Sequence, residues 1–489
     1  MTKETRHLGF LLLLVACNGG EPADTALAQA STETATAARE TIEAMRRGGG
    51  RDGSASFTPP PSTARDPGAR ESIGDAGAAL DGLSDKQRYL FNIGKLDFEE
   101  VEEVDEGLGP TLNLDSCGGC HSQPATGGTS PRINPQVALA KVGNNTLPSF
   151  LSLNGPVREA RFVRNADGSP DGGVHGLFTI SGRPDAVGCT VQQPRFEAEL
   201  ARNNVVFRIP TPVFGAGLIE AIPDSEIRRN AAAASNSKQA LGIRGRPNML
   251  LTGQSITGTP NHNGNDGTIG RFGWKAQNKS LLIFSGEAYN VEMGITNLAF
   301  PTERDETAGC QILAPQPNSE ADLDAGSPAD GLSSIEKFTV FMRFLAPPRP
   351  STQVTGATAD SIEAGRRQFT DVGCALCHTP TLNTHVAASP ASMAGKAVDL
   401  YSDLLLHDMG IGLADGIQQG QASGREWRTA PLWGLGQRLF FLHDGRTGDL
   451  REAITAHYST GSEANAVTKA FFALPDAQQQ ALLNFLRSL

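Results

Sequence analysis

Two pentapeptides have the residue types and the spacing for covalent haem attachment. Cys117-Gly118-Gly119-Cys120-His121 and Cys374-Ala375-Leu376-Cys377-His378 both read Cys-x-x-Cys-His. In this motif the two thiols add across the vinyl groups of a haem, and the adjacent His binds its iron. Chance alone would give the motif on the order of 0.002 times in a chain of this composition. The motifs therefore predict two haem c groups, with His121 on the first iron and His378 on the second.

A zinc site is the alternative that paired cysteines raise. The two pairs are far apart in the chain and each is followed directly by a His, which favours haem. A thioredoxin-like redox pair would need a strand-helix-strand context, which the sequence does not show. We therefore expect two covalently bound haem c groups as the cofactors.

Length and charge limit the class of protein. The chain has 489 residues, too many for one ordinary core, so two or more domains are expected. The formal net charge is −11, and Lys and Arg do not cluster anywhere in the sequence. Because binding to a phosphate backbone needs clustered cations, nucleic acid is excluded as a partner.

The N-terminus has the pattern of an export signal. Two basic residues precede an apolar run from Leu8 to Ala16, which is shorter than the roughly 20 residues of a membrane span. The end of this run, Leu14-Val15-Ala16-Cys17, resembles the lipobox of bacterial lipoproteins. That resemblance implies a signal peptide over residues 1–16 and a lipid on Cys17, which would anchor the protein to a membrane.

The alternative is a soluble periplasmic protein that is cut elsewhere, with Cys17 incidental. Asn18, rather than Asp, follows the predicted lipidation site, and by the same resemblance this favours the outer membrane over the inner one. We therefore expect a lipid-anchored protein on the periplasmic side of the cell envelope.

Two cysteines remain, Cys189 and Cys310. In an oxidising compartment, two leftover thiols are more often paired than free, so a disulfide between them is expected. The alternative is a pair of buried, unbonded cysteines.

Composition and breaks divide the chain into parts. Residues 17–82 are rich in Ala, Thr, Gly and Pro without periodicity, which indicates a disordered tether. A Pro-rich break at 347–357 predicts a linker between an N-terminal haem domain, 83–346, and a C-terminal cytochrome c domain, 358–489. Abundant Gly and scarce β-branched alternation predict a mainly α fold, with small helical domains around haem.

The two predicted domains carry matching motifs in the same order. Each has a helix-start signal, the Cys-x-x-Cys-His motif, an aromatic-Arg pair before Pro-x-x-Gly-x-Gly, a Phe-rich turn and a closing amphipathic helix. The Phe-rich turns cover 271–274 and 440–443. Five matches in one order predict an internal duplication of a cytochrome c-like domain, the N-terminal copy being enlarged by insertions.

Longer phrases of the chain point to one family. They are FRIPTPVFGAGLIEAI, GRFGWKAQNKSLL, YNVEMGIT, YSDLLLHDMG, RTAPLWGLG and FLHDGRTGDLREAITAHY. From about residue 85 to residue 489 the chain resembles the di-haem oxidoreductase, putative peroxidase family, which is related to bacterial di-haem cytochrome c peroxidases. The resemblance implies a peroxidatic haem in the N-terminal domain and electron entry at the C-terminal haem.

The resemblance also implies roles for two residues near the first haem. Trp274 matches a tryptophan between the two haems of the peroxidases, and the alternative is an ordinary core Trp. Glu292 matches the distal glutamate that moves a proton between peroxide oxygens, and the alternative is a solvated Glu. The peroxidases place a Gln upstream of that Glu, whereas this chain reads Leu282-Ile283-Phe284, a departure from the peroxidase pattern.

Two residues compete for the sixth position on the second iron. The place that matches the peroxidase ligand lies near His457, which we favour, and Met409 is the alternative. A Met ligand raises the reduction potential of a haem, whereas a second His lowers it. The resemblance further implies that the carbonyl groups of Thr429 and Pro431 bind Ca²⁺ between the domains.

Together these features predict a di-haem oxidoreductase. Electrons from a periplasmic donor, a small cytochrome or a cupredoxin, would enter at the second haem and reach the first, which reduces hydrogen peroxide or a related oxidant. Two alternatives stay open. One is an electron-transfer lipoprotein with both irons six-coordinate, and the other is a di-haem oxidant of a protein or organic partner.

Overall fold

The computed structural model describes residues 57–489 except 72–73, 251–254, 257–258, 261–267 and 314. The expected signal peptide, Cys17 and the first part of the tether lie outside these residues. Within the described residues, no helix is long and apolar enough to cross a bilayer.

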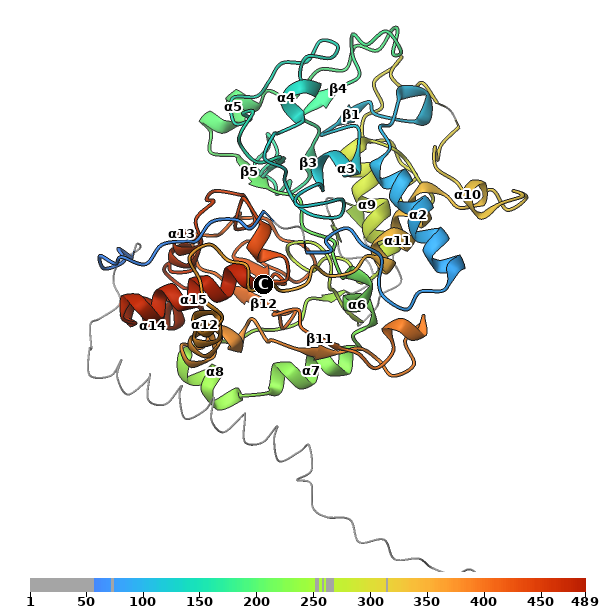
Figure 1. Cartoon of the computed structure of the whole chain (residues 1–489). Helices are drawn as coiled ribbons and strands as arrows, with labels where there is room; N and C mark the ends of the chain where they lie inside the picture. The colour runs from blue at the N-terminus through green and yellow to red at the C-terminus, as the bar shows by residue number, and fades with distance from the viewer. Residues whose placement is uncertain (1–56, 72–73, 251–254, 257–258, 261–267, 314) are drawn as a thin grey trace, which may run out of the picture.

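Helices supply most of the regular structure (Figure 1). The α-helices are α2 (Asp85–Glu99), α3 (Cys117–Cys120), α4 (Gln136–Leu139), α5 (Phe196–Ala201), α6 (Ala216–Ala221), α7 (Asp224–Ala232), α8 (Ser235–Leu241), α9 (Leu281–Met293), α10 (Pro328–Gly331), α11 (Ser334–Phe344), α12 (Ala359–Asp371), α13 (Leu450–Ala456), α14 (Asn465–Ala473) and α15 (Asp476–Ser488). The 3₁₀ helices are η1 (Val104–Glu106), η2 (Cys374–Leu376), η3 (Ala391–Met393) and η4 (Leu435–Gln437).

The strands have two to four residues each. They are β1 (Thr111–Leu112), β2 (Glu159–Phe162), β3 (Val174–His175), β4 (Phe178–Thr179), β5 (Val205–Arg208), β6 (Met249–Leu250), β7 (Ser255–Ile256), β8 (Thr259–Pro260), β9 (Thr268–Ile269), β10 (Leu382–Asn383), β11 (Ala397–Val398), β12 (Leu406–Asp408) and β13 (Glu426–Arg428). Antiparallel pairs join β1 to β4, β6 to β9, β7 to β8, β10 to β11 and β12 to β13, and β2 lies between β3 and β5. The fold is therefore mixed, with helices in the majority. The short strands pair within the long loops that connect the helices.

Each half of the molecule is closed by a helix that packs across the helix preceding its Cys-x-x-Cys-His motif. In the N-terminal region α11 packs on α2, and a Cβ at Gly94 would collide with the carbonyl oxygen of Lys337. In the C-terminal region α15 packs on α12, and a Cβ at Gly365 would collide with the carbonyl oxygen of Ala481. Glycine lets the helix backbones touch at both crossings. The two helix pairs are therefore built in the same way.

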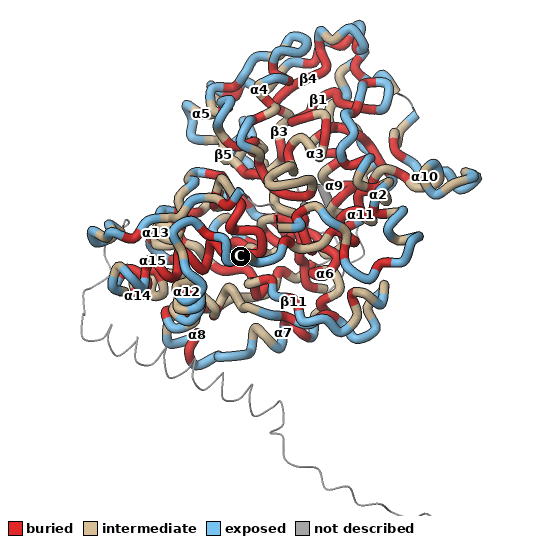
Figure 2. Tube along the Cα trace, in the orientation of Figure 1, coloured by how far each residue is buried: buried red, intermediate tan, exposed pale blue. Residues whose placement is uncertain are grey.

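The core consists of two main apolar clusters. The larger gathers side chains of α2, α9 and α11 with those of the surrounding loops, and it extends into the C-terminal region through side chains from 382–405 and Trp433. The smaller gathers side chains of α12, α14 and α15 with those of η4 and α13. Figure 2 shows buried backbone running through both halves and through the zone where they meet. The continuous burial holds the two motif-bearing regions at a defined separation.

The structure differs from the expected division at 347–357. The helices α7 and α8, expected in the N-terminal domain, lie beside the C-terminal helices (Figure 1). Asn230 Nδ2 donates to Thr379 Oγ1 at 3.1 Å, and the Asn383 amide donates to Glu226 Oε1 at 3.0 Å. Part of the N-terminal sequence therefore completes the C-terminal region, and the boundary in space is not the boundary in sequence.

The described end of the predicted tether is ordered. Residues 57–71 lie along α15, where Asp66 forms an ion pair with Arg487 at 2.6 Å. Arg70 donates to the carbonyl oxygen of Leu489 at 2.9 Å and is itself buried. The expectation of disorder is therefore wrong for this segment, because its charged side chains find buried partners that composition alone does not reveal.

Cys189 and Cys310 form a disulfide across a separation of 121 residues. Both are buried, and both lie in the loops that enlarge the N-terminal region. The structure thus agrees with the expected pairing. The bond ties the loop after β4 to the loop that follows α9.

Candidate functional site

The first pocket lies between α3, α9 and the turn that carries Trp274. Cys117, Cys120 and His121 line one side, and Glu292 of α9 lines it together with Trp274. The two cysteines are free thiols. The sequence-predicted residues of the first haem therefore share one cavity, although Cys117 and Glu292 lie far apart in the chain.

His121 is oriented for binding a metal through one ring nitrogen. Its Nδ1 lies 3.1 Å from the carbonyl oxygen of Gly128. Burial lowers the pKa of His121 to about 4, so the ring is neutral at physiological pH. An Nδ1–H that donates to a backbone carbonyl leaves the Nε2 lone pair for iron. The geometry therefore fits the role of proximal ligand.

Glu292 has an unusual protonation equilibrium. Burial, and then the negative charge of Glu159, raise the pKa of Glu292 to about 8. Arg161 opposes this shift but does not cancel it. A carboxyl group with such a pKa exchanges protons near neutral pH, which is the range that general acid-base chemistry needs.

Other charged side chains surround Glu292 in the first pocket. The acidic and basic residues of the lining are Glu159, Glu287, Glu292, Arg158, Arg161 and Arg208. Glu159 and Arg161 form an ion pair, and Asn278 donates to Glu287. This pocket is therefore polar on the α9 side, where a small hydrophilic ligand would be stabilised.

The second pocket has the same motif but a more apolar lining. Cys374, Cys377 and His378 line it together with both candidate sixth ligands, His457 and Met409. Both cysteines are free thiols. The lining otherwise consists largely of Leu, Ile, Phe, Val and Ala side chains from α13, α14 and α15 and from the loops around them. Such a cavity suits the apolar faces of a porphyrin.

Two histidines of the second pocket are held by backbone carbonyls. His378 Nδ1 lies 3.0 Å from Tyr401 O, and His457 Nδ1 lies 2.8 Å from Ala453 O. Each arrangement leaves Nε2 for a metal. Burial lowers the pKa of both rings, and the charge of His457 contributes to the shift at His378. Both imidazoles therefore present an Nε2 that could bind iron in the same pocket, and Met409 lines that pocket as the alternative.

Trp274 connects the two pockets, since its side chain lines both of them. Its Nε1 donates to Ile209 O at 2.9 Å, which fixes the indole plane. The His443 ring meets Trp274 edge-on, with ring centroids 6.4 Å apart, and stacks on Trp427 at 3.8 Å. A chain of aromatic rings therefore runs between the cavities.

A buried ionic cluster lies beside these rings. Lys275 Nζ is 3.1 Å from Asp415 Oδ1, and Arg208 Nη2 is 2.6 Å from Asp415 Oδ2. Lys275 also lies over the Trp427 ring, 4.1 Å from its centroid. Burial lowers the pKa of Lys275 to about 8, and the nearby Asp415 limits the shift. Lys275 is thus tied into the interdomain contact.

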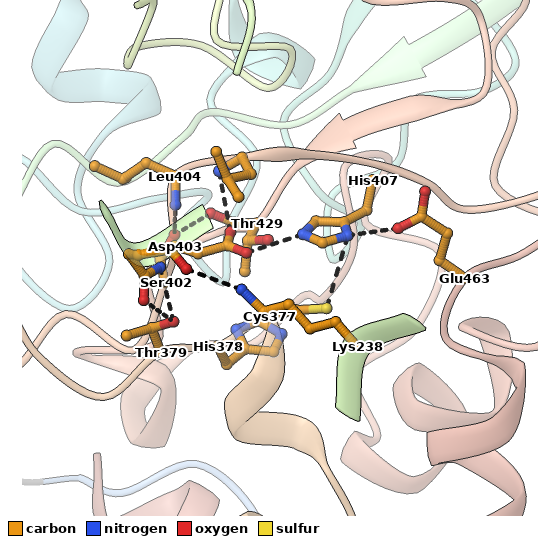
Figure 3. Close-up of polar contacts among 12 residues, drawn as sticks. Lys238, Cys377, His378, Thr379, Ser402, Asp403, Leu404, His407, Thr429 and Glu463 are labelled. Carbon is orange, nitrogen blue, oxygen red and sulfur yellow. Dashed lines mark hydrogen bonds and ion pairs between the residues drawn. The ribbon is translucent and has the colours of Figure 1, made fainter. Parts of the chain in front are cut away.

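His407 is also at the second pocket, but its ring is occupied by carboxylates (Figure 3). Its Nε2 lies 3.0 Å from Asp403, and its Nδ1 lies 2.8 Å from Glu463. A Cβ at Gly245 would collide with this ring. With both nitrogens engaged, His407 positions the β12 turn rather than a metal.

The expected calcium site does not fit the structure. Thr429 O accepts hydrogen bonds from Ser402 Oγ at 2.6 Å and from Arg428 at 3.2 Å. Pro431 O accepts one from Arg438 at 3.0 Å. Positively charged donors at both carbonyls repel a cation, and Ca²⁺ needs six or more oxygen ligands. The described residues also contain no cluster of three or more His, Cys, Asp or Glu side chains that could hold a metal ion.

Two residues of the first pocket were not expected from the sequence. Gln277 lines the pocket, is buried, and has an Oε1 without a hydrogen-bond partner. Sequence reasoning sought an amide upstream of Glu292 on the helix, whereas this one lies on the turn three residues after Trp274. Ala288, one turn before Glu292, also lines the pocket. The one sequence signal that could have identified Ala288 is that it matches His457 when the two helices are aligned at their N-caps.

The residues present fit a haem in each pocket. Each cavity offers two free thiols, a neutral His with a carbonyl-bound Nδ1, and apolar side chains around them. These are the groups that a thioether-linked haem requires.

No curated protein matches the chain. A solved structure that resembles it is the hydrazine synthase of Kuenenia stuttgartiensis, pressurized with 20 bar xenon, at 13% identity, covering 90% of this chain and 98% of that chain with a TM-score of 0.34. Residues 158–489 match the family model described as di-haem oxidoreductase, putative peroxidase, and the chain belongs to this family.

Proposed function

We propose that this di-haem oxidoreductase carries electrons from its second haem to its first, where hydrogen peroxide or a related oxidant is reduced. The haems are attached covalently at Cys117 and Cys120, and at Cys374 and Cys377. The observation that carries the proposal is Trp274, which lines both cavities. A haem in each pocket supplies an iron that exchanges single electrons and, where a coordination position is free, binds a small oxidant.

The helix that follows each Phe-rich turn supports an open first haem. Ser280 caps α9 and Asp449 caps α13. Counted from these caps, His457 and Ala288 occupy the same eighth position, and both side chains line their pockets. Alanine cannot bind iron. The position that would supply the sixth ligand of the second haem, His457, therefore corresponds to a residue without a metal-binding group, Ala288, at the first haem.

The same correspondence supports an internal duplication. Phe272 pairs with Asn278, and Phe441 pairs with Thr447, in matching bridges before the two capped helices. The glycine contacts at the two terminal helix pairs match as well. We infer that the two regions descend from one haem-binding unit, with insertions in the N-terminal copy.

Glu292 supplies the proton chemistry at the first haem. Its carboxylate would take a proton from one oxygen of hydrogen peroxide and deliver it to the other, which leaves as water, while the electrons that cleave the O–O bond would come from the haems. Gln277 offers an amide in the same cavity, which would hold the peroxide by hydrogen bonds.

His457 is the proposed sixth ligand of the second haem, because its Nδ1 is already held by Ala453 O. Two His ligands lower the potential of a haem relative to His and Met. A lipid on Cys17, an export signal over 1–16 and a periplasmic donor, a small cytochrome or a cupredoxin, complete the proposal. The outer membrane is the favoured location.

The test is rapid mixing of the half-reduced holoprotein with hydrogen peroxide, followed at the Soret band. We expect a spectral change at the first haem and oxidation of the second. Electron paramagnetic resonance of the resting protein should show one high-spin and one low-spin iron. A spectrum unchanged by peroxide in every redox state would instead identify an electron carrier.

A further inference from the structure

Two arginines, Arg428 and Arg438, face the second pocket at the side where it meets Trp274. Both line the second pocket, and both also line a smaller cavity between the regions that Trp274 and Gly273 border. Arg428 Nε donates to Gly273 O at 3.0 Å, and Arg438 Nη2 donates to Pro431 O at 3.0 Å. These bonds fix the two guanidinium groups at one end of the pocket.

Neither arginine has an acidic partner. Among the described residues, no carboxylate lies within 4.0 Å of either side chain, and both guanidinium groups donate to backbone carbonyls. Two buried arginines of this protein do have one: Arg208 pairs with Asp415, and Arg271 pairs with Asp224. Arg428 is buried and Arg438 is half-buried, and cations withdrawn from water without a carboxylate partner are costly, so an anion is expected to compensate them.

The protonation of the pair points the same way. Burial lowers the pKa of both arginines to about 10, and the charge of Arg438 adds to the shift at Arg428. Both groups therefore remain charged at neutral pH, and each raises the electrostatic cost of the other.

The position of the pair identifies the anion. The thioether bonds at Cys374 and Cys377 fix the vinyl edge of the haem, and the two carboxylates of a haem lie on the opposite edge of the ring. The smaller cavity that contains both arginines is lined by neither of these cysteines nor by His378. Arg428 and Arg438 thus lie away from the attachment edge, beside Trp274.

We propose that Arg428 and Arg438 bind the two carboxylates of the second haem and hold that edge of the ring against Trp274. The guanidinium pair takes the place at Thr429 and Pro431 where the family resemblance implies calcium. The inference rests on a haem at the second motif, but not on any reaction with peroxide.

The sign of the electrical effect follows from the charges. A cation near a haem favours the reduced iron, which carries one positive charge less than the oxidised iron. Replacing one arginine by a neutral side chain should therefore lower the potential of the second haem. The released carboxylate also gains a pKa in the accessible range, so the potential should become dependent on pH.

The experiment is a spectroelectrochemical titration of the holoprotein at several pH values without peroxide. For Arg438→Gln and for Arg428→Gln we expect the equilibrium constant for reduction of the second haem to fall about tenfold. For one electron this lowers the reduction potential by about 59 mV. We also expect a new pH dependence. Arg438→Lys keeps the positive charge but loses the planar guanidinium group, so it should shift the potential less than Arg438→Gln does. Arg367→Gln, which removes an exposed arginine of α12, is the matched control and should change nothing.

Unchanged potentials and pH profiles in both neutral variants would overturn the proposal. If neither variant retains haem, the wild-type protein decides, since a chelator and added Ca²⁺ should both leave its second-haem potential unchanged. A potential that falls with chelator and recovers with Ca²⁺ would show that calcium, not the arginine pair, neutralises the carboxylates. Peroxide reactivity, measured separately, reports on the first haem alone.

Discussion

The helices α9 and α13 occupy the same place after the two Phe-rich turns, yet they close their pockets differently. The eighth residue after the N-cap is His457 at the end of α13, where it is the C-cap, whereas in α9 it is Ala288. The helix α9 continues to residue 293 and so brings Glu292 into the first pocket, while α13 ends at residue 456. In the proposed function, His457 would bind iron in the second pocket, whereas Glu292 would carry protons in the first.

The two Phe-rich turns, 271–274 and 440–443, also differ at a matched position. Trp274 and His443 hold equivalent positions and touch each other across the boundary between the regions. The indole lines both cavities, whereas the His443 ring lies in the second one only. Burial lowers the pKa of His443 to about 3, so this ring is neutral and adds no charge to the path. The two pockets therefore differ at a few positions that match in the sequence.

The largest effect should come from making the first pocket like the second. Ala288→His places an imidazole where His457 lies in the other unit, so the first haem should become six-coordinate and low-spin. Electron paramagnetic resonance should lose its high-spin signal, and the reaction with peroxide should disappear. Ala221→His, on α6 outside both pockets, is the control. A persistent high-spin signal with full haem content would show that the two helices are not equivalent.

The reverse change tests the second pocket. His457→Ala should remove the sixth ligand of the second haem, alter its low-spin spectrum and open it to external ligands such as cyanide. Met409→Ala should leave that spectrum as it is. If instead Met409→Ala changes the spectrum and His457→Ala does not, the ligand is Met409.

The proton carrier should matter next. Glu292→Gln keeps the shape but loses the titratable group, so the peroxide reaction should slow by roughly 10²-fold. The pKa of Glu292 is raised to about 8, and only the carboxylate accepts a proton, so the wild-type rate should rise with pH up to about 8 and level off above it. Glu197→Gln, on an exposed helix, is the control. A pH-independent rate would assign proton transfer to another group.

The disulfide distinguishes the regions in stability. The N-terminal loops are tied by Cys189 and Cys310, whereas the C-terminal region has no disulfide among its described residues. Replacing both cysteines by Ser should lower the free energy of unfolding by about 2–5 kcal/mol. Denaturant unfolding should show the loss at the first haem, with the second haem nearly unaffected. Equal loss at both haems would mean that the regions unfold as one unit.

The smallest effect concerns the aromatic path. Trp274→Phe should slow electron transfer from the second haem to the first several-fold while leaving peroxide binding intact. Trp427→Phe should have less effect, because Trp427 lines only the second pocket and has Lys275 over its ring. Rapid mixing with separate observation of the two haems measures both steps. Equal slowing in the two variants would place the path through both rings.

The sequence by itself determined the haem motifs and the family resemblance. Cys-x-x-Cys-His acts within five residues, so its chemistry does not depend on distant parts of the chain. The order of the matched motifs and the helix-start signals before the two haem motifs are also local, and the structure begins α2 and α12 there, although Thr358 is the residue that caps α12.

Only the tertiary structure decided which side chains meet at each iron. It brought Gln277 into the first pocket, placed arginine donors on the carbonyl groups expected to bind calcium, and packed residues 57–71 against α15. It also moved α7 and α8 to the C-terminal half. Such contacts join residues far apart in the chain, and their partners depend on how helices cross and where buried charges find compensation. Periodicity and motif spacing carry no information on how helices cross or on which groups compensate a buried charge.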